Sequence, residues 1–218
     1  MATALTAQEK VREPVEQFVT TTFYHGVPID LARQYDSNDV RKLIDLLNDS
    51  EQKEHWGNIL WVLGAIGDER ALDAVLNFTE SRFKGAVDGV TFNAIIQGNL
   101  ALGLLGNRNT KAADYVTNAT SLKFWNERDI DWQYKTLKDR GERDILLTQL
   151  AINSLPLTAK LEVLETLTRL RETIAQGKEM QAYFGPNIEE SIERYAVIQS
   201  KGLRGVLNYS DTAYRYAD

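Results

Sequence analysis

Aromatic and charged side chains are interleaved between Ser121 and Asp144 in a pattern that could form a binding site. The stretch contains the large aromatic residues Trp125, Trp132 and Tyr134. The charged residues among them include Arg128, Asp129, Asp131, Arg140 and Arg143. Tryptophan, tyrosine and arginine carry much of the binding energy at protein interfaces, and aromatic rings also stack on unpaired bases. This stretch is therefore the candidate partner-binding segment.

Three interpretations of the candidate segment remain open. In the first, which we favour, the tryptophan rings fill the core of an irregular helix pair. In the second, the same side chains form a protein-binding patch. In the third, the segment contacts nucleic acid, with Trp132 stacking on a base and Asp129 or Asp131 stabilising charge at the sugar.

Other residues with catalytic or ligand-binding potential lack the required spacing. His25 and His55 are the only histidines, and they do not form the H-x-x-x-H or H-E-x-x-H pattern of a zinc site. The sequence has no cysteine, which excludes thiolate ligands and a thiol nucleophile. Gly98, Gly103 and Gly106 do not make a dinucleotide fingerprint and follow no predicted strand. We therefore predict no catalytic residue, metal or cofactor, and expect the chain not to be an enzyme.

The candidate segment follows a pattern that occurs twice. Trp56-Gly-Asn-Ile-Leu-Trp-Val-Leu-Gly64-Ala-Ile-Gly67-Asp68 is matched 39 positions later by a stretch that begins at Ile95. That second copy reads Ile-Ile-Gln-Gly-Asn-Leu-Ala-Leu-Gly-Leu-Leu-Gly-Asn and ends at Asn107. Each copy is predicted to be an apolar helix that ends at a glycine, followed by a second helix. The glycines therefore mark helix ends and close helix contacts.

The remaining sequence predicts further helices on both sides of the two copies. Amphipathic spacing predicts helices over 7–22, 28–35, 39–48, 51–66, 69–82, about 88–105 and 108–120. The pair over 28–48 is interpreted as a degenerate first repeat. A weaker third copy begins at Ile145, 50 positions after Ile95, and Pro156 takes the place of the glycine that ends the helix.

The last third of the chain is predicted to contain two long helices and a tail. Thr158 is expected to cap a helix that Gly177 closes, and Asn187 to open another that runs to about Lys201. The tyrosine-rich tail is expected to cover the end of the stack. No segment alternates polar and apolar residues over a strand length, so the sequence predicts no sheet.

Composition places the chain among ordinary globular proteins. It has 218 residues, 43% of them hydrophobic, and a formal net charge of −6. The charge is concentrated in residues 1–120, where 11 Lys and Arg face 16 Asp and Glu. An acidic half disfavours nucleic-acid binding there. No signal peptide or apolar run of about 20 residues occurs, so we expect a cytoplasmic protein without a membrane span.

The repeated unit resembles a known family of helical repeats. Leu63-Gly64-Ala-Ile-Gly67-Asp68, followed by a helix with alanine and leucine on its inner face, is similar to a HEAT repeat of the phycobilisome-lyase type. The second copy keeps this turn with asparagine in place of aspartate. The resemblance covers 50–120 well and 28–48 and 140–176 loosely. It implies a concave surface that usually binds protein, while bilin lyase subunits and HEAT-like alkylpurine DNA glycosylases also belong to this group.

These observations predict an all-α fold. We expect one domain over 1–218, an α-α superhelix of about three to four helix pairs that is right-handed, with extra helices at both ends, including 187–218. The predicted function is non-catalytic binding of a partner protein through the concave face. One alternative is a bilin-lyase-like chaperone or transferase. The other is a DNA glycosylase, which predicts a basic patch formed by Arg128, Arg140 and Arg143 facing a groove.

Overall fold

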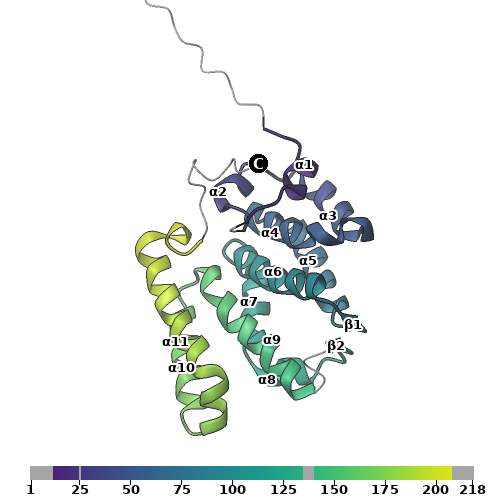
Figure 1. Cartoon of the computed structure of the whole chain (residues 1–218). Coiled ribbons are helices and arrows are strands. Elements are labelled where there is room, and N and C mark those ends of the chain that lie inside the picture. Colours follow the sequence, from purple (N-terminus) through teal and green to yellow (C-terminus); the bar gives the residue numbers. More distant parts are fainter. Residues whose placement is uncertain (1–11, 25, 135–139, 208–218) are drawn as a thin grey trace, which may run out of the picture.

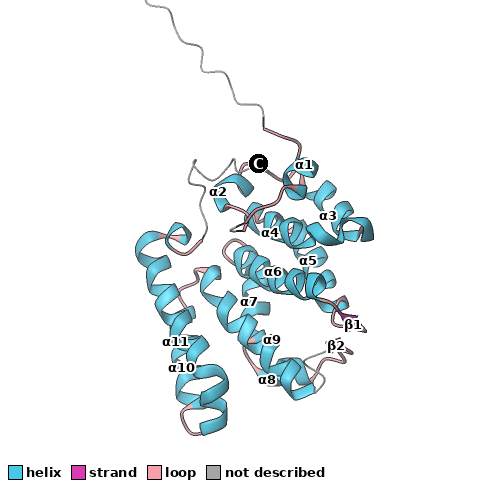
Figure 2. Ribbon diagram, in the orientation of Figure 1, coloured by secondary structure: helices cyan, strands magenta, loops and turns pink. Residues whose placement is uncertain are grey.

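The fold is all-α, as the sequence predicts. A computed structural model describes residues 12–24, 26–134 and 140–207 of the chain. Figures 1 and 2 show a molecule built almost entirely from helices. The α-helices in the described residues are α1 (Val15–Thr20), α2 (Ile29–Ala32), α3 (Val40–Asn48), α4 (Trp56–Ile66), α5 (Arg70–Ser81), α6 (Gly89–Gly106), α7 (Thr110–Ala119), α8 (Leu122–Asn126), α9 (Arg140–Ser154), α10 (Val163–Ile174) and α11 (Lys178–Lys201).

The helices pack in the order of the sequence. Helix α6 lies between α4 and α9, and α5 and α7 also pack against α6. Helix α11 packs against both α9 and α10 (Figure 1). The main hydrophobic core extends through these contacts from Val15 in α1 to Leu203 after α11. Helices α4 and α6 are buried along much of their length. This burial explains why their sequences are apolar on more than one side.

Equivalent glycines of the two repeat copies lie where successive helix pairs touch. A methyl group added at Gly64 would lie 2.7 Å from the Cα of Ala101 in α6. One added at Gly103 would lie 2.5 Å from the carbonyl oxygen of Ser154 at the end of α9. The prediction that small residues allow close helix approach is confirmed at Gly64 and Gly103. At both positions the approach is to the following helix pair, not to the helix's own partner.

Gly64→Ala is expected to lower the free energy of unfolding by about 1–3 kcal/mol, because the new methyl group would meet backbone atoms that cannot move aside locally. Chemical denaturation monitored by circular dichroism measures the change. Gly89→Ala is the matched control. Gly89 is the first residue of α6, where an added methyl group would meet no atom within 4 Å, and alanine favours a helix. A loss at Gly64 no larger than the change at Gly89 would contradict the packing role.

Two glycine turns end the repeat helices differently. Gly67 ends α4 with φ of 70°, and its N–H donates to the carbonyl oxygen of Leu63. This left-handed terminus is the one that the sequence predicts. Gly106 is instead the last residue of α6, and the chain continues through Asn107 in a right-handed conformation. Its lack of a side chain serves packing, since a methyl group there would lie 2.8 Å from Thr158.

Helix α6 begins at a capped aspartate. The Asp88 carboxylate accepts a hydrogen bond of 2.9 Å from the N–H of Thr91 and forms an ion pair with Lys53. The Lys53 ammonium and the Thr91 N–H hold the pKa of Asp88 well below its usual range. A carboxyl whose pKa is lowered by folding stabilises the protein at pH values above its unfolded pKa. That contribution is lost as the pH falls through the folded pKa.

Asp88→Ala is expected to lower the free energy of unfolding at pH 7 by about 0.5–2 kcal/mol through loss of the cap. The difference between wild type and variant should shrink as the pH falls below about 3.9, because the Asp88 carboxyl of the unfolded chain then becomes protonated while that of the folded chain stays ionised to lower pH. Urea denaturation of both proteins between pH 2.5 and 7 measures this. A difference that is constant over this range would exclude the charged cap as its cause.

Three predicted boundaries in the chain are wrong. The predicted helix over 51–66 begins as a 3-10 helix, Ser50–His55, and becomes α4 only at Trp56. The helix expected from Thr158 begins at Val163, because a 3-10 turn, Leu155–Thr158, ends at Ala159 with φ of 52°. The helix expected to open at Asn187 begins at Lys178 instead.

Helix α11 continues through Pro186 because one side of it is buried from Phe184 to Ile198. Its buried residues recur at helical spacing on both sides of the proline: Phe184, Ile188, Ser191, Tyr195 and Ile198. Proline removes one backbone hydrogen bond, but packing against α9 and α10 holds the helix together. Gly177, expected to close the preceding helix, is the N-cap residue of α11.

A very short sheet is also present, against the prediction of none. β1 (Ala86–Val87) pairs in parallel with β2 (Gln133–Tyr134). Two residues are too few for an alternating pattern, and the partners lie far apart in the sequence. The predicted helix over 7–22 is seen as α1, with residues 1–11 outside the described part of the chain. The predicted tail cap over 208–218 also lies outside it.

Candidate functional site

The two tryptophans of the candidate segment lie in a second hydrophobic core. Trp125 is 0% exposed and Trp132 is 5% exposed. The ring of Phe83, at the end of α5, lies 6.4 Å from the Trp125 ring and 5.6 Å from the Trp132 ring, between centroids. The Trp125 indole N–H donates to the carbonyl oxygen of Ala119 over 2.7 Å. Both rings therefore pack the segment against α5, α6 and α9 and are not available to a partner.

The three arginines of the segment are engaged inside the chain. Arg143 is buried, forms an ion pair with Asp144 of 2.6 Å, and donates to the carbonyl oxygen of Ile130. Arg140 is exposed, but one of its nitrogens donates to the carbonyl oxygen of Asn126 over 2.7 Å. The guanidinium groups thus hold the loop after α8 against the first turn of α9. They do not form the basic patch that a DNA glycosylase would present.

Arg128 belongs to a network that joins three elements. Its guanidinium carbon lies 3.4 Å from the centroid of the Phe124 ring, and its Nε donates to the Glu80 carboxylate over 3.2 Å. The Tyr115 hydroxyl donates to the same carboxylate oxygen over 2.9 Å. Burial and the neighbouring Glu80 charge raise the pKa of Tyr115, so this hydroxyl stays protonated. The network connects α5, α7 and α8.

Asp129 and Asp131 are exposed, as are Lys123 and Glu127 of the same segment. Asp131 also ties the segment to the loop after α5, since its carbonyl oxygen accepts from the N–H of Gly85 over 3.0 Å. Tyr134 lies in β2, and its side chain is outside the described part of the structure. His55 precedes α4 at a half-buried position, while His25 is outside the described residues. Neither of the two hollows described below is lined by a residue of this segment.

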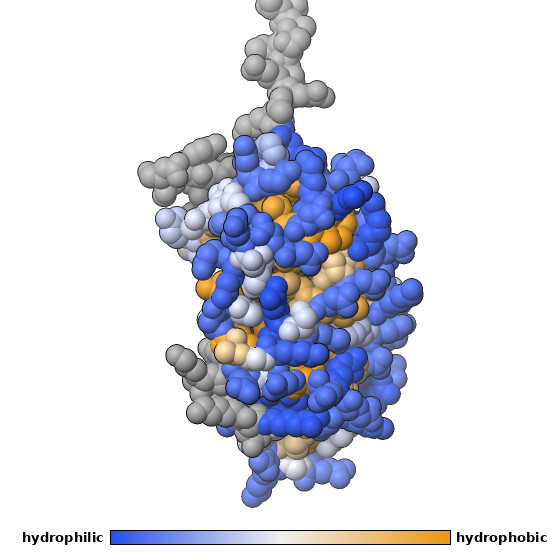
Figure 3. All heavy atoms as spheres, turned by 90° about the vertical axis from the view of Figure 1, so that its right-hand side faces the viewer, coloured by the Kyte–Doolittle hydropathy of each residue, from blue (hydrophilic) through white to orange (hydrophobic). Residues whose placement is uncertain are grey.

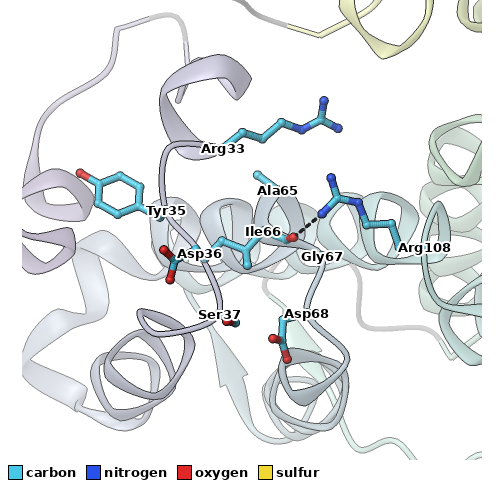
Figure 4. A pocket seen from close by; sticks show the side chains of 9 residues that line it. All are labelled: Arg33, Tyr35, Asp36, Ser37, Ala65, Ile66, Gly67, Asp68 and Arg108. Atoms are coloured by element: carbon cyan, nitrogen blue, oxygen red, sulfur yellow. Dashed lines mark hydrogen bonds between the residues drawn. The ribbon is translucent and has the colours of Figure 1, made fainter. Parts of the chain in front are cut away.

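A hollow of about 580 Å³ lies elsewhere, across the turns that end the helices. We call it the turn groove. Three turns contribute to it: the one after α2, the one after α4 and the one after α6. Figure 4 shows the side chains that line the turn groove, which are Arg33, Tyr35, Asp36, Ser37, Ala65, Ile66, Gly67, Asp68 and Arg108.

A second hollow, of about 650 Å³, adjoins the turn groove and shares Gly67 and Arg108 with it. Its lining adds polar residues from the starts of α5 and α7, including Arg70 and Lys111. The two hollows follow the same row of turns. A segment of extended chain could therefore contact several successive turns at once.

Basic side chains hold these turns in a fixed order. Arg70 donates to the carbonyl oxygen of Ser37 over 2.7 Å. Arg108 donates to that of Ile66 over 2.8 Å, and Lys160 to that of Asn107 over 3.4 Å. In each case a cation in one turn satisfies a carbonyl of the preceding turn. Positive charge is favourable at Ile66 and Asn107, because they stand at the C-terminal ends of α4 and α6, the negative end of each helix dipole.

The carboxylates of the turn groove already have partners. Both Asp68 oxygens accept hydrogen bonds of 2.8 Å from Arg70, whose side chain lowers the pKa of Asp68. An oxygen of Asp36 accepts from the N–H of Asn38 over 2.8 Å. In contrast, the Arg33 side chain has no hydrogen bond or ion pair within the described part of the chain. The turn groove thus offers the Arg33 guanidinium as an unused donor.

This arrangement suits recognition. Guanidinium groups bind carboxylates and other planar anions with paired hydrogen bonds. No histidine lines the turn groove. Within the described ranges, no group of three or more His, Cys, Asp and Glu side chains could hold a metal ion. The turn groove therefore contains groups that suit anion binding.

Sequence reasoning did not single out Arg33 or Arg108. A signal was present, because a basic residue follows the terminating glycine in both repeat copies, at Arg70 after Gly67 and at Arg108 after Gly106. These basic residues indicate a binding site only when the turns of successive helix pairs are known to lie along one edge of the molecule. Large aromatic residues drew attention to 121–144 instead, although their size also suits a core.

Searches against protein-family models, curated proteins and solved structures found no match. Within the described part of the chain, α6 is long and apolar enough to cross a membrane, with 61% of this helix buried inside the molecule. A buried helix in the core of a soluble protein can be as long and as apolar as α6. The hydropathy of α6 alone does not determine where the protein resides.

Proposed function

We propose that the chain is a non-catalytic protein-binding module and that the turn groove is its binding site. The observation that carries this proposal is that Arg33 and Arg108, two guanidinium groups, both line one hollow formed by three turns (Figure 4). Exposed arginine in a concave site is a common anchor for protein partners. The turns that hold it are fixed by hydrogen bonds between successive helix pairs.

We further propose that the helix pairs form a HEAT-like α-α superhelix. Support comes from the equivalent contacts of Gly64 and Gly103, each with the following pair. It also comes from the succession of α4, α6 and α9, each packed on the next. In such an arrangement equivalent turns recur along one edge. The partner-binding surface then lies along this edge, in place of the segment over 121–144.

The polar character of the surface is consistent with this choice. In the face shown in Figure 3, hydrophobic residues reach the surface in patches separated by hydrophilic side chains. The large hydrophobic side chains that are exposed in the described residues are scattered over three regions, namely Tyr24, Leu161, Leu164 and Tyr183. A polar anchor is therefore better supported than an apolar groove.

Comparative affinity capture tests the proposal. The wild-type chain, Arg33→Glu and Arg169→Glu are immobilised separately and exposed to extract from the source cells, and captured proteins are quantified by mass spectrometry. Arg169 is an exposed arginine of α10 that does not line the groove, so its variant carries the same change in charge. We expect a reproducible partner that Arg33→Glu loses and Arg169→Glu keeps. A partner retained equally by all three would reject the turn groove as the site.

The same purified chain also tests the two alternative functions, those of a bilin-lyase-like chaperone or transferase and of a DNA glycosylase. A bilin-lyase-like chaperone would change the absorbance spectrum of an added bilin. A DNA glycosylase would bind DNA with strong salt dependence. Neither alternative is favoured by an observation in the described residues. A bilin shift or salt-dependent DNA binding, without a captured protein, would replace the present proposal.

A further inference from the structure

The two arginines of the turn groove differ in what they already bind. Arg33 is the C-cap residue of α2 and is exposed, and its side chain makes no hydrogen bond or ion pair in the described ranges. Arg108 uses one terminal nitrogen, which donates to the carbonyl oxygen of Ile66 over 2.8 Å. A guanidinium has five N–H donors, so most of the donors of this pair remain free.

The geometry of the turn groove separates these donors from the nearby carboxylates. In Figure 4 the side chains of Arg33 and Arg108 both extend into the hollow beside Ala65. Asp68 points away from them, toward α5, and is held by Arg70. Two cations that line one hollow repel each other. A ligand carboxylate between them would remove this repulsion and use their free donors.

The surroundings favour a carboxylate that belongs to a peptide. The turn groove of about 580 Å³ continues into the adjoining hollow, where the cations Arg70 and Lys111 line the wall together with Glu69 and Asp73. An extended segment could place one acidic side chain between the two arginines and another near Lys111. A volume of about 580 Å³ exceeds that of a single small anion.

The overall negative charge of the chain disfavours binding of an acidic ligand anywhere except at a local cluster of cations. The formal net charge is −6, so the molecule as a whole repels an acidic ligand. Only a local set of cations can overcome this repulsion. Non-specific attraction of an acidic peptide is therefore disfavoured.

We infer that the turn groove binds an acidic peptide segment of the partner, with a carboxylate held between Arg33 and Arg108. This inference rests on the proposed function and specifies the chemistry of the partner. Arg33 acts as the main specificity residue, because it has no structural bond of its own. Arg108 binds the other side of the carboxylate. It also holds the turn after α4 through its hydrogen bond to the carbonyl oxygen of Ile66.

Fluorescence anisotropy with a labelled hexaglutamate peptide tests the inference, at low salt and with a labelled hexaglutamine peptide as the neutral comparison. Wild type should bind hexaglutamate saturably and hexaglutamine at least ~10-fold more weakly. Arg33→Glu should weaken hexaglutamate binding by ~10-fold or more, since it places a negative charge beside the bound carboxylate. Arg169→Glu, with the same charge change on α10, should alter binding less than ~2-fold.

Inorganic phosphate added as a competitor separates a peptide site from a simple anion site. We expect displacement only at concentrations that act through ionic strength. Displacement by phosphate at the concentration of the peptide, equal weakening by both variants, or no saturable binding to wild type would overturn the inference. If capture still depends on Arg33 in any of these cases, the proposed function stands and only the acidic nature of the partner is rejected.

Discussion

Replacing Trp125 by alanine is expected to lower the free energy of unfolding by about 3–5 kcal/mol. The side chain is 0% exposed and its ring packs against Phe83 and Phe124. Its indole N–H is also the hydrogen-bond donor to the carbonyl oxygen of Ala119. The variant loses buried apolar surface and leaves that carbonyl without this donor. Denaturation in urea, followed by far-ultraviolet circular dichroism, measures the loss.

Two comparison variants distinguish packing from partner contact. Trp125→Phe keeps most of the ring but removes the hydrogen bond, so an intermediate loss is expected. Asp129→Ala changes an exposed neighbour on the same segment and should stay within about 0.5 kcal/mol of wild type. A loss below about 1 kcal/mol for Trp125→Ala would contradict its place in the core.

Arg143→Met is expected to cost about 3–5 kcal/mol, because it leaves the Asp144 carboxylate buried without its counter-ion. The side chains of the pair are 5% and 2% exposed. The second oxygen of Asp144 is buried and has no hydrogen-bond partner in the described residues. Only Arg143 forms an ion pair with this carboxylate within that part of the chain.

A double variant supplies the control for this prediction. Arg143→Met combined with Asp144→Leu removes both charges from the buried site, so most of the lost stability should return. Denaturation of the four proteins gives the coupling energy of the pair. Additive losses in the double variant would show that the ion pair is not what each single substitution disrupts.

The helical fold could be predicted from the sequence because its signals are local. Apolar spacing and the Gly67 turn place α4 and α5 within a few residues. Asp88 is likewise readable as the cap of α6. These local signals gave wrong helix boundaries where tertiary contacts determine how far a helix extends. Helix α11 is the example, because it continues through Pro186 with its buried face packed on α9 and α10.

The candidate site could not be predicted in the same way. The segment over 121–144 was singled out by residue types, but composition does not tell a buried tryptophan from an exposed one. Burial of Trp125 depends on Phe83, which is more than 40 positions away. The turn groove likewise depends on bringing the turn after α2 beside those after α4 and α6. These are contacts between distant parts of the chain that one sequence does not reveal.

The second core explains why the candidate segment interrupts the repeat spacing. The loop between α8 and α9 pairs through β2 with β1, and Arg143 donates to its Ile130 carbonyl. Its residues therefore close the space beside α6 and α9. Substitutions of its buried residues, such as Ile130 and Trp132, should therefore lower the stability of the fold.

Amide hydrogen exchange of the chain, alone and bound to a partner identified by capture, tests the central claim most directly. We expect the partner to slow exchange in the turns around residues 33–37, 66–68 and 107–109, which line the turn groove. Exchange in residues 126–131 should change little. Protection confined to 126–131, with unchanged exchange in the three turns, would contradict the assignment of the turn groove as the binding site.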